Sequence, residues 1–242
     1  MTTFITNPAE IQLRACPHQL ADLSPPAEGE LHVWHALPAL HHLDLDPSEF
    51  LAPDERERLE LFRFETDRHN FFFCRSMLRI LLASYLGTSP AELHFAYSDH
   101  GKPSLAAPSS NLEFNLSHSH GAVLFALTRG GRIGVDVEHV RHDVNVEEIA
   151  ARFFSTAEQL DLERSSEKYD AFFRCWTRKE AFVKARGEGL SCPLDSFDVS
   201  VGPQEDVTLT TRPDSAEAQN WRLLSLDAIP GYSAAVACEV CP

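Results

Sequence analysis

Residues 122–138, AVLFALTRGGRIGVDVE, decide the fold of this chain. Two apolar runs, Ala122–Leu127 and Ile133–Val137, have the length and the β-branched content of buried strands. The segment between them, Arg129-Gly-Gly-Arg132, is typical of a tight turn. The stretch therefore predicts two buried strands at the centre of the chain, with a sharp reversal between them.

The second of these strands carries two carboxylates. Because side chains alternate between the faces of a strand, Asp136 and Glu138 are predicted on one face, while Val135 and Val137 point to the core. Two carboxylates this close repel each other unless a cation lies between them. Oxygen ligands on a strand suit Mg²⁺, which usually keeps several waters and shares phosphate oxygens with its substrate. A solvated strand edge with two acids is the alternative.

A long amphipathic helix is predicted on each side of this centre. The first covers Thr66–Leu86, where apolar residues recur at helical spacing and Gly87 ends the helix. The second covers about Glu167–Arg186 and ends at Gly187. Further strands are predicted at Leu31–Leu37, Leu93–Tyr97, Leu112–Leu116, Ser196–Val201, Trp221–Leu226 and Tyr232–Ala237.

The fold class that follows is α+β (α/β), with two similar, pseudo-symmetric lobes. Each lobe is expected to be a small, mainly antiparallel sheet packed by one long helix, with a single cleft between the lobes. The turn at Arg129–Arg132 is the expected junction, so the lobes are predicted as residues 1–129 and 130–242. Residues 1–30 are polar and are expected to run along the surface before the first strand.

Two more motifs carry side chains suited to an anionic ligand. Glu180 and Lys184 stand four residues apart on the second helix and project from one face, which an ordinary Glu–Lys helix pair would also explain. Lys102 lies on a glycine–proline turn, where a lysine can meet a phosphate as a point charge. Ser117 and His118 follow the end of a predicted strand and could donate to the same anion.

Composition excludes several classes of partner. The chain has 242 residues, 43% hydrophobic and 24% charged, which is ordinary for a globular protein. Its 36 acidic and 21 basic residues leave a net charge of −15, so nucleic acid and anionic membrane surfaces, which need a basic face, are not expected as partners.

The sequence shows neither a secretory signal nor an apolar stretch long enough to span a bilayer. The scattered cysteines are therefore expected to be reduced thiols in a cytoplasmic protein. The one close pair, Cys238 and Cys241, lacks the second ligand pair that a zinc site would need.

In their order and separations, these motifs resemble those of the Sfp-type 4′-phosphopantetheinyl transferases, over roughly Arg63–Val199. The first thirty residues and the tail after about residue 205 carry no specific match. The motifs that carry the resemblance are Gly101-Lys-Pro, Phe114-Asn-Leu-Ser-His118, Gly134-Val-Asp-Val-Glu138, Phe153-Phe-Ser155, Trp176-Thr-Arg-Lys-Glu180-Ala-Phe-Val-Lys184 and Gly189-Leu-x-x-Pro-Leu-Asp-Ser-Phe197.

The resemblance implies an enzyme that transfers the 4′-phosphopantetheine group from coenzyme A to a serine of an apo acyl or peptidyl carrier protein and releases 3′,5′-ADP. It also implies Mg²⁺ as cofactor and coenzyme A as co-substrate. The length of the chain and its two expected lobes favour a monomer in which both lobes build one cleft. Two alternatives stay open. One is another Mg²⁺-dependent phosphoryl or nucleotidyl transferase, and the other is a catalytically dead module that binds coenzyme A or a carrier.

The resemblance also implies roles for individual side chains. Asp136, Glu138 and Glu180 correspond to metal ligands, and Lys184 to the lysine that meets the transferring phosphoryl group. The general base would be either Glu180 or a water held by the acids. The resemblance thus implies Glu180, Lys184 and Asp136 as the catalytic residues. The expected contacts to coenzyme A are Lys102, Ser117, His118, Arg75 and Arg63.

Overall fold

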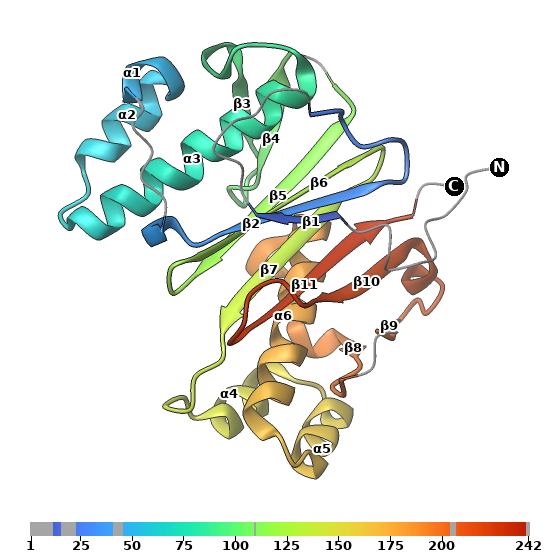
Figure 1. Ribbon diagram of the computed structural model, residues 1–242. Coiled ribbons are helices and arrows are strands. Elements are labelled where there is room, and N and C mark those ends of the chain that lie inside the picture. Colours follow the sequence, from blue (N-terminus) through green and yellow to red (C-terminus); the bar gives the residue numbers. More distant parts are fainter. Residues whose placement is uncertain (1–11, 16–22, 41–45, 109, 204–206, 241–242) are drawn as a thin grey trace.

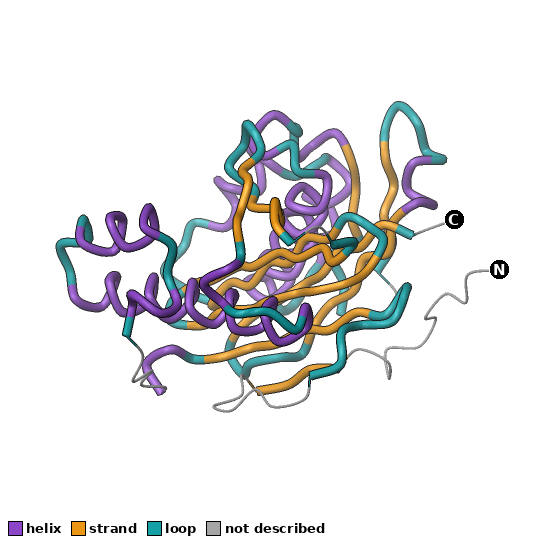
Figure 2. Tube along the Cα trace, turned by 90° about the horizontal axis from the view of Figure 1, so that it is seen from above, coloured by secondary structure: helices purple, strands orange, loops and turns teal. Residues whose placement is uncertain are grey.

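The computed structural model describes residues 12–15, 23–40, 46–108, 110–203 and 207–240. Its strands gather in the middle of the molecule, and the helices lie outside them (Figure 1, Figure 2). No helix of the described residues has both the length and the apolar character needed to cross a membrane.

The first lobe is a four-stranded sheet packed by one long helix. The strand order is β1-β2-β6-β5, in which only the β1–β2 pair is parallel. Helix α3 (Glu65–Leu86) buries Leu78 and Leu81 against this sheet, and Gly87 at φ 64° ends it. The strands are β1 (Gln12–Ala15), β2 (Leu31–Ala36), β5 (Leu112–Ser119) and β6 (Ala122–Arg129).

The second lobe repeats this plan with a three-stranded antiparallel sheet. Its order is β10-β11-β7, and helix α6 (Lys168–Arg186) packs on it with Phe172 and Phe182 in the core. Gly187, at φ 74°, ends α6 as predicted. The strands are β7 (Ile133–His139), β10 (Trp221–Leu226) and β11 (Tyr232–Glu239).

The two sheets meet in a shared core. Val33 and Leu124 of the first sheet pack in one cluster with Val135 and Val137 of β7, which confirms that these two valines face the core. Strand β5 runs beside β7, and the backbone amide of Val135 donates to the side-chain oxygen of Asn115 at 2.9 Å. The mixed α+β fold with two helix-packed, mainly antiparallel sheets is as predicted.

Shorter elements complete the two lobes. Those of the first lobe are α1 (Pro47–Phe50), α2 (Pro53–Glu60), β3 (His94–Tyr97) and β4 (Pro103–Ala107). Those of the second are α4 (Val146–Phe153), α5 (Thr156–Arg164), β8 (Phe197–Val199) and β9 (Leu209–Thr211), with short 3-10 turns between elements.

The structure differs from the sequence-based expectations in several elements. Strand β1 lies within the segment that we expected only to trace the surface, and β4 and α4 were not predicted. Strand β5 continues to Ser119 because it pairs with β6 up to a two-residue turn at His120 and Gly121, whose φ angles are 44° and 84°. Ser117 and His118 therefore lie on a strand and not on a loop.

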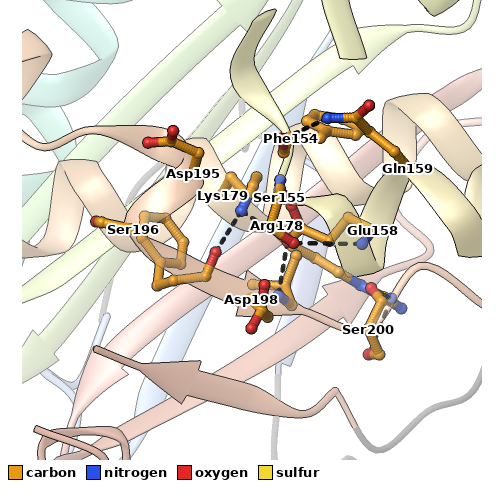
Figure 3. A network of polar contacts seen from close by, with 12 residues as sticks. Phe154, Ser155, Glu158, Gln159, Arg178, Lys179, Asp195, Ser196, Asp198 and Ser200 are labelled. Carbon is orange, nitrogen blue, oxygen red and sulfur yellow. Dashed lines mark hydrogen bonds and ion pairs between the residues drawn. The ribbon is translucent and has the colours of Figure 1, made fainter. Parts of the chain in front are cut away.

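A buried polar network anchors α6 to its own lobe (Figure 3). The ammonium of Lys179 donates to Glu158 Oε1 at 2.6 Å and to the carbonyl of Phe197 at 2.8 Å. Glu158 also caps α5 through the amide of Ser155 and accepts from the amide of Val199, both at 2.8 Å. Since every donor in this set has an acceptor, α6 is tied to α5 and β8 through the core.

Candidate functional site

A cavity of about 780 Å³ lies between the lobes and takes its lining from both of them. The first lobe contributes Phe71, Arg75 and His118, among others, and the end of α6 contributes Lys184 and Gly187. Cationic and aromatic groups thus line one space at the junction of α3, β5 and α6.

Two acids of β7 accept hydrogen bonds from two serines of β5, in the neighbouring sheet. Asp136 is only 3% exposed, and its Oδ1 accepts from Ser117 Oγ at 2.9 Å. Two residues further along both strands, Glu138 Oε2 accepts from Ser119 Oγ at 2.5 Å. Asp136 and Glu138 therefore share one face of β7, as predicted, and two alternate serines hold them there.

Ser119 was missed by the sequence reasoning, which placed the 117–121 segment in a loop. The signal that could have found it is the matching alternation of Ser-His-Ser on β5 and Asp-Val-Glu on β7. Because side chains alternate along each strand, such period-two patterns put the two serines on one face of β5 and the two acids on one face of β7.

Helix α6 delivers the second half of the site. Lys184 Nζ donates to Asp136 Oδ1 at 2.6 Å and to Ser117 Oγ at 2.9 Å. Glu180 lies one turn before Lys184 on α6. Burial, followed by the negative charge of Asp136, raises the pKa of Glu180, while the ammonium of Lys184 opposes the rise. The structure thus brings the β7 acids and the α6 pair into one electrostatic environment.

The chemistry of this donor set fits a hard cation. Asp136 Oδ2 is buried and, among the described residues, has no hydrogen-bond partner, so one carboxylate oxygen is left for another ligand. The acidic neighbours Glu138 and Glu180 add their negative charge to the same place. Among the described residues, however, no three His, Cys, Asp or Glu side chains lie close enough together to hold a metal ion as they stand. The negative charge of Asp136 is instead paired with the ammonium of Lys184.

Lys102 lines the cavity, but its ammonium binds protein atoms. It donates to the carbonyl oxygens of Ile133 at 2.9 Å, Lys184 at 2.7 Å and Ala185 at 3.2 Å. Burial lowers the pKa of Lys102 to about 8. The expected contact between Lys102 and a phosphate stays a prediction.

Of the other predicted contacts, His118 and Arg75 line the cavity, whereas Ser117 and Arg63 do not. Arg75 packs against Phe71, and its buried Nη1 lies 3.8 Å from Glu55 Oε1 with no hydrogen-bond partner in the described part of the chain. Burial and then the charge of Lys184 lower the pKa of His118. Arg63 instead stacks over the ring of Phe64.

Arg58 was not predicted, yet it lines the cavity beside Phe71. Its sequence neighbourhood is a run of alternating charges on α2, Asp54-Glu-Arg-Glu-Arg58, which points to a solvated helix. Only the packing of α2 beside α3 directs this arginine to the site.

Family models match nearly the whole described chain. The model described as the 4′-phosphopantetheinyl transferase superfamily matches residues 132–237, and the model described as the N-terminal part of 4′-phosphopantetheinyl transferase matches residues 38–129.

Individual proteins agree with these models. The chain is 36% identical over 214 residues to the 4′-phosphopantetheinyl transferase HetI of Nostoc sp., covering 86% of this chain and 87% of HetI. It is 32% identical over 189 residues to the 4′-phosphopantetheinyl transferase Sfp of Bacillus subtilis, covering 77% and 81%. Among solved structures, the holo-[acyl-carrier-protein] synthase of Thermotoga maritima aligns with a TM-score of 0.39 and 17% identity, over 47% of this chain and 66% of that chain.

Proposed function

The chain belongs to the 4′-phosphopantetheinyl transferase superfamily, and from this premise we propose how its own residues carry out the transfer. In the proposed reaction, a serine hydroxyl of an apo acyl or peptidyl carrier protein attacks the phosphorus that bears the pantetheine arm of coenzyme A. The bond from that phosphorus to the oxygen of 3′,5′-ADP breaks. The carrier leaves with the arm as a phosphodiester, and 3′,5′-ADP leaves as the second product.

The observation that carries this proposal is the meeting of β7 and α6 beside the cavity. Asp136, with a free carboxylate oxygen, together with Glu138 and Glu180, would hold Mg²⁺. When bound, the ion supplies neutralisation of charge on the diphosphate. Lys184, whose ammonium donates to the other oxygen of Asp136, Oδ1, would meet the transferring phosphoryl group.

The proton of the attacking serine needs an acceptor. Glu180 is suited to this role because its raised pKa makes its carboxylate a stronger base than an ordinary surface glutamate. A water held by the acids is the other candidate base. Either base would accept the proton that the serine hydroxyl loses as its oxygen bonds to phosphorus.

For the nucleotide end of coenzyme A we propose Arg75 and His118, which line the cavity with Lys102 as a neighbour, and Ser117, which stands behind the lining on Asp136 and Lys184. Arg75 Nη1 is ion-paired with Glu55 but has no hydrogen-bond partner in the described part of the chain, and an arginine suits a phosphate because its fork of donors matches phosphate oxygens. We leave Arg63 as an outer contact, since it does not line the cavity.

We further propose that the lobes divide into residues 1–129 and 130–242, and that the enzyme is a cytoplasmic monomer. The two family models, which end at residue 129 and begin at residue 132, support the division. A cavity lined by both lobes of one chain supports a monomer. The described cysteines are all free thiols, which supports a reducing compartment.

The test is transfer to a panel of apo carriers, with coenzyme A and Mg²⁺, followed by mass spectrometry of the carrier. We expect a mass gain of one phosphopantetheine group with the wild-type enzyme. Asp136→Ala and Glu180→Ala should lose turnover while keeping the melting curve of a folded protein. Asp227→Ala, which removes an exposed acid, is the matched control and should keep wild-type activity.

Near-normal labelling by the Asp136→Ala enzyme would remove the metal assignment. Transfer of a nucleotidyl group in place of the arm would point to a different transferase. Binding of coenzyme A by calorimetry without any labelling would identify a binding module.

A further inference from the structure

Lys102 projects from a turn that is held in one shape. The turn joins β3 to β4, and the amide of Gly101 donates to the carbonyl of Ser98 at 2.8 Å. The amide of Lys102 donates to Ser98 Oγ at 3.1 Å, and Gly101 takes a φ of 78°, which favours glycine. The backbone that carries the Lys102 side chain is therefore fixed before the side chain reaches across to the other lobe.

The ammonium of Lys102 satisfies the end of α6. The carbonyls of Lys184 and Ala185 lie in the last turn, where a helix offers them no partner of its own. The amide of Gly187 donates to the carbonyl of Val183, one residue before them, and Lys102 Nζ donates to the carbonyls of Lys184 and Ala185. A positive charge is also favoured at the negative end of the helix dipole.

The same ammonium holds β7, at the place where β7 and α6 touch backbone to backbone. Lys102 Nζ donates to the carbonyl of Ile133 at 2.9 Å. At the next residue, a Cβ added to Gly134 would lie 2.2 Å from the carbonyl oxygen of Ala181 and 2.2 Å from the amide nitrogen of Ala185, so only a glycine permits this approach. Lys102 thus connects the β3–β4 turn with the end of α6 and the start of β7, one residue before the close backbone contact at Gly134.

A second contact from the turn supports the same docking. A Cβ added to Gly189, just after α6, would lie 3.2 Å from Cβ of His100. The turn therefore lies against the segment that follows α6 as well as against its last carbonyls.

We propose that Lys102 is a positioning residue for the transfer: it fixes the last turn of α6 against β7, so that the side chain of Lys184 meets Asp136 and Ser117. Lys102 holds the backbone carbonyl of Lys184, and Asp136 holds the ammonium of the same residue. The inference rests on the proposed function, and it gives Lys102 a role other than direct binding of a phosphate.

The test compares Lys102→Met with Lys102→Arg and with Lys168→Met, a control that removes an exposed lysine of the same helix. Melting curves give the folded fraction, calorimetry gives the Kd of coenzyme A, and steady-state labelling gives kcat and KM. For Lys102→Met we expect kcat per folded molecule to fall about tenfold or more, because small misplacements of a catalytic group are that costly. We expect the Kd of coenzyme A to stay within about twofold, since the ammonium is bonded to carbonyls. Lys102→Arg, which keeps charge and donors, should retain more of kcat than Lys102→Met.

Two results would overturn the proposal. If Lys102→Met lowers only the melting temperature and leaves kcat per folded molecule unchanged, Lys102 is a scaffold residue. If it raises the Kd and KM for coenzyme A about tenfold with kcat unchanged, Lys102 binds the phosphate. Absence of labelling by the wild-type enzyme would instead contradict the proposed function, so the two failures are distinguishable.

Discussion

Two carboxyl groups of the site, those of Asp136 and Glu180, lose their protons less readily than ordinary surface acids. Burial raises the pKa of Asp136, opposed by Lys184, and burial together with the charge of Asp136 raises that of Glu180. A carboxyl group binds a metal only after it has lost its proton, so metal binding should strengthen as pH rises through these raised values. We predict that the Mg²⁺ concentration for half-maximal labelling is lower at about pH 7.5 than at about pH 5.5, above the ordinary carboxyl range. The measurement is a Mg²⁺ titration of the labelling rate at both pH values.

The control for this titration is the Kd of coenzyme A without metal, measured at the same two pH values, which separates protonation of the acids from changes in the nucleotide pocket. An equal Mg²⁺ requirement at both pH values would contradict the assignment of these acids as ligands.

At the scale of one element, α6 is fixed by the buried pair of Lys179 and Glu158. Removing one partner of a buried ion pair leaves the other charge desolvated and uncompensated. We therefore predict that Lys179→Met lowers the free energy of unfolding by about 3–5 kcal/mol, measured by urea denaturation. Lys179 and Glu158 are both almost completely buried, so solvent does not screen this ion pair as it screens a surface pair.

The same chain offers a matched comparison in Lys168→Met. Lys168 pairs with Glu147 at 2.9 Å on the exposed side of α6, where solvent screens the pair. Its removal should leave the unfolding midpoint unchanged. An equal loss of stability in the two variants would show that burial does not govern these pairs.

At the scale of the whole molecule, the net charge affects the rate at which the enzyme and a carrier protein associate. The net charge of −15 should repel an acidic carrier protein at long range. Salt shortens the Debye length from about 30 Å at 0.01 M to about 8 Å at 0.15 M and so weakens that repulsion. We predict that kcat/KM for an acidic carrier rises with salt over this range, measured as the initial rate of labelling.

The Kd of coenzyme A, measured in the same buffers, corrects for the effect of salt on the nucleotide site. Faster labelling at low salt would contradict the prediction and would indicate a basic docking surface on this acidic protein.

Local patterns predicted the parts of the site that lie on one element. Strand alternation placed Asp136 and Glu138 together, and helix spacing placed Glu180 near Lys184. The same patterns failed for Ser119, because the length of β5 is decided by its pairing with β6. They also could not find the partners of Lys102, since Lys184 lies 82 positions away in the chain.

By itself, the sequence determined the faces of β7 and α6, the glycine ends of both long helices and the position of the central turn. These properties depend on periodicity and on backbone conformations that act over a few residues. The tertiary structure alone decided that the serines of β5 meet the acids of β7, and that the Lys102 ammonium joins the ends of two elements. Such contacts depend on which faces pack together and how closely two backbones approach, as Gly134 permits here, and no local pattern specifies that approach.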